Sequence, residues 1–322
     1  MNKVKFKVED AASYDEVAGI FDELTEAHAR PLARALAGAI DAPARRRVLD
    51  IGCGTGLVAF EVARQAGGAA GNAAGNGPEN ADGRPAEVIG IDLSEGMLSA
   101  AAAKAPEADP AGRVSFRRGD AEALDLPDGY ADGYVSLYAY RHFPHPDRAA
   151  AEAFRVLAPG GRCAIAIGSA PRLLSVPGMG RAAAALARMT REGLGRERAA
   201  PGHLDALVAR HVPSVPVVET SEWSDGLSDP SGRLMEILAG AGFADLRRDW
   251  VGARFDLPDT EAFWRLQTTL STPSRKRMAL AAPGELAALK EAFWRDCEAV
   301  LARGGRLTYR IGAALLTCRK PG

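Results

Sequence analysis

The sequence lacks several features that would point to particular classes of protein. Its four cysteines form no C-x-x-C pair, which argues against a disulfide framework or a bound metal and favours reduced packing residues. The formal net charge is −1, so the basic excess of a general nucleic-acid binder is missing. No apolar run reaches the roughly 18 residues of a membrane span, and the first ten residues do not resemble a signal peptide. We therefore expect a cytoplasmic protein with neither a membrane span nor a nucleic-acid partner.

The composition is otherwise that of an ordinary globular protein, with 47% hydrophobic and 25% charged residues among 322. This length allows one large α/β domain with appended elements. Heavy use of alanine, glycine and arginine is typical of a GC-rich bacterial genome. Residues Ala66–Pro85 are nearly all Ala, Gly, Asn and Pro. With so few large apolar side chains to bury, this segment is predicted to be a mobile surface insertion.

The segment from Val48 to Gly56 carries the most information about function. A short apolar run containing Asp50 leads into three glycines at alternate positions. The pattern predicts a buried parallel strand, a tight loop and a helix over Leu57–Gln65, because only glycine lets backbone and ligand approach so closely. The dinucleotide fingerprint G-x-G-x-x-G would need a glycine in place of Leu57, so pyrophosphate, and NAD with it, is disfavoured. The acid before the glycines suits a cationic group better.

A second acid, Asp92, closes another strand-like run that starts at Glu87. In a doubly wound fold, an acid at this place accepts hydrogen bonds from ribose hydroxyls. Asp92 lies further beyond Gly56 than the roughly 20 residues typical of such units, and the segment 66–85 accounts for the extra length. The two acids and the glycine loop together predict a nucleotide-like ligand that carries a cationic group.

This order of motifs resembles the class I S-adenosylmethionine-dependent methyltransferases. Their third strand ends in a G-D-A turn like Gly119–Ala121, and their R-V-L-x-P-G-G turn is similar to Arg155–Gly161. The resemblance implies that S-adenosylmethionine is the cofactor, that S-adenosylhomocysteine is its product, and that Asp120 accepts from the adenine amino group. The implied cofactor-binding residues are Asp50, Gly52, Cys53, Gly54, Gly56, Asp92, Leu93, Met97, Asp120, Ala121 and Tyr138.

The loop Leu137–His142 resembles the S-F-G-L/I-R-N segment of ubiquinone/menaquinone-type C-methyltransferases. The resemblance implies that Arg141 polarises a water or stabilises an enolate-like oxygen, and that Tyr138 packs near the sulfonium. His142 stands where that family has asparagine, so it is a candidate base, although a hydrogen bond within the loop would explain it equally well. The catalytic candidates are Arg141 and His142, and the candidate cleft residues are Tyr14, Tyr140 and Phe143.

Alternating strand and helix signals from 47 to 169 predict an α/β fold, and the resemblance implies a Rossmann-like class I methyltransferase fold with a seven-stranded, mostly parallel sheet. Its last strand, 307–316, is expected to be antiparallel. Residues Tyr14–Ile40 have the period of two amphipathic helices broken near Pro31. The predicted parts are an N-terminal helical cap (1–46), a cofactor-binding core (47–169), a helical lid with no clear strand (170–231) and a completion of the sheet with substrate-capping helices (232–322). Helices are expected over 179–190, 204–211, 232–241, 259–270 and 283–303, and a strand over 243–255.

The functional prediction is transfer of a methyl group to a carbon or oxygen of a small organic acceptor, such as a secondary metabolite or a quinone-like compound. Two alternatives stay open. The fold could use S-adenosylmethionine without consuming it, in a rearrangement, cyclisation or elimination, or the chain could be a binding protein with a vestigial pocket. The acceptor and the oligomeric state are left open, a homodimer included. Glu122, Asp125 and Asp128 are interpreted as solvated loop charges.

Overall fold

The computed structural model describes residues 3–15, 17–67, 86–168, 194–200, 202–215 and 229–322, together with residues 190, 223 and 227. The chain divides into two compact units. Unit 1 comprises Met1–Ser169, Ser221–Val251 and Gly312–Gly322, and unit 2 comprises Ala170–Thr220 and Gly252–Ile311. The four-part division expected from the sequence stays a prediction, as does the lid. The expected insertion from residue 68 on, and the expected helix up to residue 189, lie outside the described residues.

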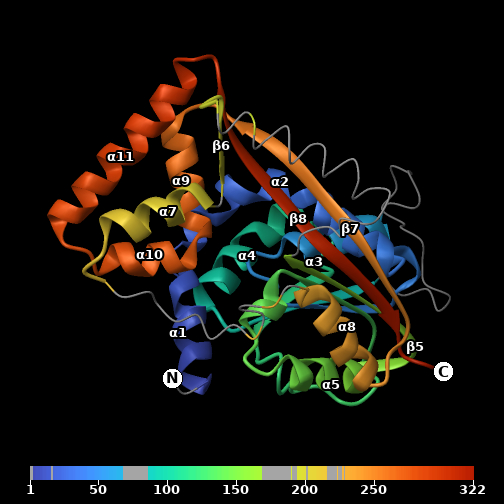
Figure 1. Ribbon diagram of the computed structural model, residues 1–322. Helices are drawn as coiled ribbons and strands as arrows, with labels where there is room; N and C mark the ends of the chain where they lie inside the picture. The colour runs from blue at the N-terminus through green and yellow to red at the C-terminus, as the bar shows by residue number, and fades with distance from the viewer. Residues whose placement is uncertain are drawn as a thin grey trace. The chain divides into compact units, whose positions relative to one another are not determined.

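The core of unit 1 is a mostly parallel sheet (Figure 1). Its parallel strands are β1 (Arg47–Ile51), β2 (Glu87–Asp92), β3 (Val114–Arg118), β4 (Ala131–Leu137) and β5 (Leu157–Gly168). They follow the order β3-β2-β1-β4-β5, and β8 (Arg306–Arg319) pairs antiparallel with β5. In unit 2, β6 (Glu197–Ala200) pairs with residues 306–309 of β8. Among the described residues, seven strands thus lie on one hydrogen-bonded path, and β7 (Ala244–Leu257) pairs with β8 outside it. The predicted fold class and antiparallel last strand are confirmed.

Helices cover both faces of this sheet because its strands are apolar on both sides. The helices of unit 1 are α1 (Lys3–Asp15), α2 (Ala18–Ala39), α3 (Leu57–Gly67), α4 (Glu95–Ala108), α5 (Pro146–Val156) and α8 (Pro230–Gly240), with 3-10 turns η1 (Ala42–Ala44) and η2 (Ala139–His142). Helices α5 and α8 lie side by side (Figure 1). They pack in one core cluster with Leu49, Ile51 and Ile165 of the strands. Helix α3 contacts α2, and Asp50 points toward it.

One expectation for the N-terminal region is wrong, and one helix there was not foreseen. Helix α2 runs through Pro31 without a break, since it begins at Ala18 and ends at Ala39. Proline costs a helix one hydrogen bond. The residues that follow Pro31 compensate for this loss, because Leu32 and Leu36, one turn apart, are buried and pack against the rest of unit 1. The additional helix α1 was not predicted, because its lysines and apolar residues show no clear helical stripe.

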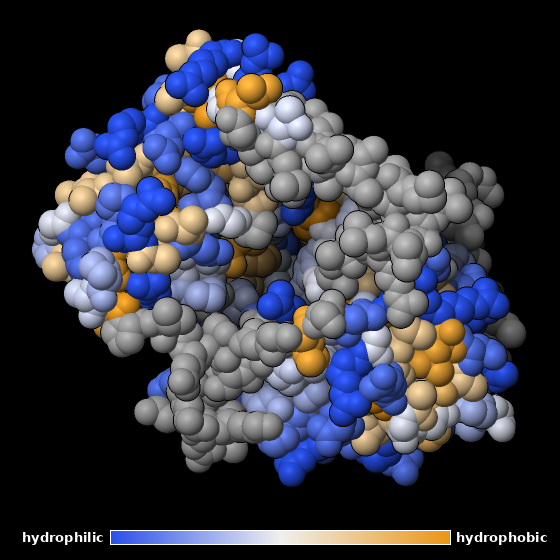
Figure 2. Space-filling view, viewed as in Figure 1, coloured by the Kyte–Doolittle hydropathy of each residue, from blue (hydrophilic) through white to orange (hydrophobic). Residues whose placement is uncertain are grey.

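Unit 2 contains helices α7 (Gly202–His211), α9 (Thr260–Leu270), α10 (Thr272–Ala279) and α11 (Pro283–Leu301). Rings of Phe263 and Phe293 form its centre, with centroids 5.7 Å apart. Apolar residues of α11 turn inward, and the surface over α11 is mixed in Figure 2. Helices α7, α9 and α11 were predicted, whereas α10 was missed because its sequence, T-P-S-R-K-R-M-A, has almost no apolar residues.

Strand β6 corrects the expectation that 170–231 contains no clear strand. Its first residue, Glu197, is buried and accepts a hydrogen bond from the Thr308 hydroxyl at 2.9 Å. The guanidinium groups of Arg254 and Arg310 each lie 3.6 Å from the same carboxylate. This strand is four residues long and begins with a buried charge, so it has no apolar pattern from which it could be predicted. Among the described residues, no helix is long and apolar enough to cross a membrane.

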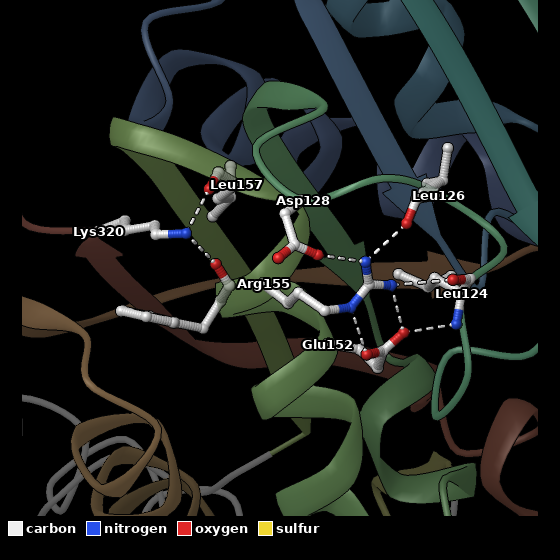
Figure 3. A network of polar contacts seen from close by, with 8 residues as sticks. Leu124, Leu126, Asp128, Glu152, Arg155, Leu157 and Lys320 are labelled. Atoms are coloured by element: carbon white, nitrogen blue, oxygen red, sulfur yellow. Dashed lines mark hydrogen bonds and ion pairs between the residues drawn. The ribbon is translucent and has the colours of Figure 1, made fainter.

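Arg155, in the last turn of α5, connects this helix to the loop 124–128 (Figure 3). Its guanidinium donates to the backbone oxygens of Leu126 at 2.6 Å and Leu124 at 2.9 Å. It also donates to the carboxylates of Glu152 at 2.8 Å and Asp128 at 2.9 Å. Both carboxylates raise the pKa of Arg155, Glu152 most strongly. One side chain thereby holds the loop 124–128 against α5.

Replacing Arg155 with methionine is expected to lower the free energy of unfolding by about 2 kcal/mol, because two backbone oxygens lose their donor. The side chain is 31% exposed, so water compensates part of the loss. The matched control is Arg118→Met, which removes a single pair between Arg118 and Glu95 with the arginine side chain 61% exposed. Urea denaturation should show less than about 0.5 kcal/mol for this control. Equal losses in both variants would contradict the assigned role.

Candidate active site

The glycine loop connects β1 to α3 and closes tightly against its neighbours. Gly52, Gly54 and Gly56 have φ of 68°, 51° and 85°, which side chains other than glycine rarely adopt. The Gly52 N–H donates to the Ile91 oxygen at 2.8 Å and so ties the loop to β2. A Cβ on Gly52 would lie 2.1 Å from the Ala139 Cβ. The loop backbone therefore lies so close to Ala139 and β2 that a side chain at Gly52 would not fit.

Asp50 is buried beneath this loop and is only 1% exposed. Its Oδ2 accepts a hydrogen bond from the Ala59 N–H at 2.9 Å, and its Oδ1 has no partner within the described part of the chain. Burial and, more weakly, the nearby Asp92 charge raise the pKa of Asp50 to about 7, although the hydrogen bond from the Ala59 N–H acts in the opposite direction. A buried carboxylate with one unused oxygen is the group that a cationic ligand would stabilise.

Asp92, at the end of β2, lies next to the loop. Its Oδ2 accepts from the Gly54 N–H at 2.8 Å and its Oδ1 from the Ser94 N–H at 2.9 Å. Burial raises the pKa of Asp92, and these backbone donors partly offset the rise. Met97 is buried against α2, with Val17 and Ala18. Within the described ranges, neither the Asp50 nor the Asp92 carboxylate is paired with a cation. Two such carboxylates attract a sulfonium or an ammonium and repel a phosphate.

Two further positions next to the loop are hydrophobic. Cys53 is buried, and burial raises the pKa of its thiol. Leu93 follows Asp92 at the end of β2 and is partly exposed. Neither side chain carries a charge in this setting, so the electrostatics of the loop come from Asp50 and Asp92.

Asp120 is in contact with the N-terminal helix α1. Both of its carboxylate oxygens lie 2.9 Å from the Lys7 ammonium, and Oδ1 also accepts from the Glu122 N–H. Lys7 forms a second ion pair with the Glu122 carboxylate at 2.7 Å. Ala121 is buried in the core cluster. The interpretation of Glu122 as a solvated charge is therefore wrong, since its side chain is 6% exposed and paired.

The loop after β4 carries the other candidate residues. Tyr138 has φ of 61°, a strained conformation for a residue other than glycine, and its N–H donates to the Ala166 oxygen at 2.8 Å. The side chains of both residues lie near Gly168, at the end of β5. A Cβ added to Gly168 would be 3.7 Å from the Tyr138 ring and 3.6 Å from the Arg141 guanidinium. The structure thus brings Tyr138 and Arg141 together at the carboxyl end of the sheet.

Two of the expected cleft residues belong to the hydrophobic core of unit 1. Tyr140 is 0% exposed, and its hydroxyl lies 3.2 Å from the Tyr134 hydroxyl, which leaves its ring no surface for an acceptor. Its backbone oxygen accepts from the Trp223 indole at 2.7 Å. Phe143 is partly buried against the same core, with its ring centroid 5.0 Å from that of Tyr140. Burial of Tyr140 corrects its assignment to the cleft.

His142 lies between two residues of α1. Its Nδ1 is 2.8 Å from the Asp10 Oδ2, and its Nε2 is 3.3 Å from the Tyr14 hydroxyl. The rings of Tyr14 and His142 meet edge to face, with centroids 5.5 Å apart. One face of α1 supplies these contacts, because residues three and four apart lie on the same side of a helix. That face carries Lys7, which pairs with Asp120, and Asp10 and Tyr14, which contact His142. Sequence reasoning missed Lys7 and Asp10, and the 7, 10, 14 spacing was the available signal.

Comparisons with known proteins agree with this geometry. Residues 49–165 match the family model described as a methyltransferase domain. The chain is 42% identical over 116 residues to the ubiquinone/menaquinone biosynthesis C-methyltransferase UbiE of Methylobacterium nodulans, a match that covers 36% of this chain and 39% of that relative. Residues 49–165 are therefore a methyltransferase domain of the class I, S-adenosylmethionine-dependent type. S-adenosylmethionine is the cofactor of this domain, as the family resemblance implied.

This chain also matches one further relative and one solved structure along most of its length. It is 29% identical over 306 residues to the nocamycin O-methyltransferase of Saccharothrix syringae, which covers 95% of this chain and 96% of that one. The YcgJ protein of Bacillus subtilis shares the fold with a TM-score of 0.50 at 20% identity, over 90% of this chain and 99% of that chain. The UbiE match spans well under two thirds of that relative, so it concerns the cofactor-binding region.

Protonation of Asp50 is expected to weaken cofactor binding. The pKa of about 7 means that Asp50 loses its charge as the pH falls below 7, so the sulfonium loses an attractive partner. The dissociation constant of S-adenosylmethionine, measured by calorimetry, should rise about tenfold between pH 7.5 and pH 6. Asp50→Asn, which cannot titrate, should bind more weakly at both pH values and show a flatter profile. A pH profile identical in both proteins would contradict the prediction.

The raised pKa of Asp50 also predicts how the stability of the cofactor-free protein depends on pH. Stability should fall as the pH rises, whereas cofactor binding should become stronger. The folded-state pKa of Asp50, about 7, lies above the ordinary value of 3.8. Without cofactor, the folded protein therefore retains a proton that the unfolded chain releases, and stability falls as the pH rises from about 4 to about 7. Asp50→Asn should consequently have the higher unfolding temperature at pH 8, even though it binds the cofactor less well.

Proposed function

We propose that this methyltransferase transfers the methyl group of S-adenosylmethionine to a hydroxyl oxygen of a small, largely apolar organic acceptor. The observation that carries the proposal is the position of His142. Its Nε2 faces a hydroxyl, that of Tyr14, at 3.3 Å. The histidine lies in the loop after β4, and substrates of doubly wound folds bind at the carboxyl ends of the strands.

The protein's part in such a reaction is small. The cofactor supplies a methyl group already activated as a sulfonium, which acts as the leaving group. The residues of the chain then have to align the acceptor, exclude water and remove one proton. Asp50 and Asp92 would attract the cationic cofactor, and the loop glycines would let it lie against the backbone. His142 would remove the acceptor proton at Nε2.

Oxygen is favoured over carbon for two reasons. The relative that matches along 95% of this chain is named as an O-methyltransferase, whereas the C-methyltransferase match covers only 36% of the chain. In addition, the loop carries a histidine that is hydrogen-bonded on both ring nitrogens. A hydroxyl needs a base of this kind, since its proton must leave as the new bond forms.

The proposal is tested with cofactor labelled in the methyl group. The protein is incubated with a panel of phenols, enols and hydroxylated polyketides, and labelled products are separated by mass spectrometry. The expected result is one labelled methyl per product, with an equal amount of S-adenosylhomocysteine, and NMR should show that the methyl is bound to oxygen. A methyl on carbon, or a product without label and with the cofactor unconsumed, would contradict the proposal.

A further inference from the structure

We propose that Asp10, on α1, is the positioning residue of the reaction: it holds the Nδ1 proton of His142, so that Nε2 is free to accept the proton of the acceptor hydroxyl at the place where the Tyr14 hydroxyl now lies. This inference rests on the proposed function. It assigns to the N-terminal helix a direct part in the chemistry, because α1 supplies both Asp10 and Tyr14.

The assignment of the ring protons follows from the partners. An ionised carboxylate is only an acceptor, so the nitrogen that faces the Asp10 Oδ2 at 2.8 Å carries a hydrogen. In the neutral ring the second nitrogen, Nε2, then has a free electron pair. Asp10 is 5% exposed, so water does not compete strongly for its carboxylate. The pair thus fixes both the tautomer and the orientation of the ring.

Tyr14 marks the direction in which His142 can accept a proton. Its hydroxyl is 3.3 Å from Nε2, which is long for a hydrogen bond to an O–H donor. An acceptor hydroxyl entering from the same side could therefore displace it with little loss. Tyr14 also packs edge to face on Phe21 of α2, with centroids 6.4 Å apart. This contact holds the ring of Tyr14 beside His142.

Helix α1 is anchored firmly enough to position a side chain. On one side of Asp10, the Lys7 ammonium pairs with Asp120 and Glu122. On the other side, Asp15 accepts from the Ser94 hydroxyl at 2.5 Å and from the Gly96 N–H at 2.9 Å. Asp10 therefore lies between two anchored points of α1, one at the turn after β3 and one at the start of α4. The contacts lie within unit 1.

The proton and electron balance of the step is complete. The acceptor oxygen forms a bond to the methyl carbon with its own electron pair, and the sulfur keeps the pair of the bond that breaks. The hydroxyl proton moves to the Nε2 of His142. The positive charge of the sulfonium is replaced by that of the imidazolium, which the Asp10 carboxylate stabilises at Nδ1. The imidazolium then returns its proton to water, and no further reactant is needed.

The test uses NMR of the whole protein labelled with ¹⁵N in histidine, because it does not depend on turnover. The chain has five histidines, and the signals of His142 are assigned from their loss in His142→Gln. In the wild type, the neutral ring is expected to carry its proton on Nδ1. Asp10→Asn should shift the ring toward the other tautomer, because an amide can donate to Nδ1. Asp10→Glu should restore the wild-type tautomer, and Glu9→Gln, on the same helix, should leave the spectrum unchanged.

Kinetics give the second reading. With an acceptor that the wild type methylates, Asp10→Asn should lower kcat at least tenfold, with unchanged affinity for S-adenosylhomocysteine, and Asp10→Glu should recover part of kcat. A wild-type proton on Nε2, an unchanged tautomer in Asp10→Asn, or a full kcat in that variant would overturn the inference. If the wild type methylates none of the acceptors, the proposed function fails, while the NMR result still decides whether Asp10 positions His142.

Discussion

Gly52→Ala is expected to weaken binding of S-adenosylmethionine at least 100-fold while the protein still folds. The substitution places a Cβ 2.1 Å from that of Ala139 and puts alanine at a φ of 68°. Such an overlap cannot be accommodated without a shift of the loop, and the left-handed conformation adds about 1–2 kcal/mol of strain. The loop would move away from Ile91, to which the Gly52 N–H donates. The cofactor would then lose its close approach to the loop backbone. It would also lose the Asp92 carboxylate, which the Gly54 N–H holds in place.

Gly160→Ala is the matched control for this experiment. Gly160 also has a left-handed φ, 78°, but a Cβ on it would meet nothing within 4 Å. It lies in the P-G-G turn at the start of β5, away from the loop. This variant should lower the unfolding temperature by a few degrees and leave the dissociation constant of the cofactor, measured by calorimetry, unchanged. Similar losses of affinity in both variants would show that general strain, and not the contact with Ala139, weakens binding.

The sheet of unit 1 could be predicted because its information is local. Each of the first strands is a short apolar run, and the residues at their carboxyl ends, such as Asp50 and Asp92, stand at fixed places in the chain. Since parallel strands end at one edge of the sheet, these acids had to meet there. The orientation of β8 came from the family resemblance, and the structure confirms it.

Other elements could not be predicted because nonlocal contacts hold them. Helix α2 continues through Pro31 since its buried face packs on α3, which no local propensity shows. Strand β6 is stabilised by a buried ion cluster around Glu197, and its partner residue, Thr308, is 111 positions away. In both places tertiary packing outweighs the preference of the local sequence.

The site shows the same division. The loop glycines and their acids were identified from spacing, whereas the partners of His142 and Asp120 were not. Asp10 is 132 positions from His142, and Lys7 is 113 positions from Asp120. The 7, 10, 14 spacing places these residues on one helix face, but nothing in the local sequence shows what that face contacts. Helix α1 brings both pairs together, so failing to predict this helix also concealed the polar contacts of the candidate base.

His142→Gln is expected to lower kcat for methyl transfer by about 10²–10⁴, the range of general base catalysis. Glutamine has no basic nitrogen, so the proton of the acceptor hydroxyl would have to pass to water. It is close to histidine in size and can still donate to Asp10, so the fold and the contact with α1 should persist. Affinity for S-adenosylhomocysteine, measured by calorimetry, should therefore change less than about threefold.

His145→Gln is the matched control, since the same change is made three residues further along the loop. His145 precedes α5, and its backbone N–H, which the substitution keeps, donates to Glu122 at 2.9 Å. Its kcat should stay close to that of the wild type. Equal losses in both variants would mean that the loop as a whole had shifted. A full kcat in His142→Gln would show that the acceptor ionises without this residue, and the arrangement of Asp10, His142 and Tyr14 would then serve only to hold α1 in place.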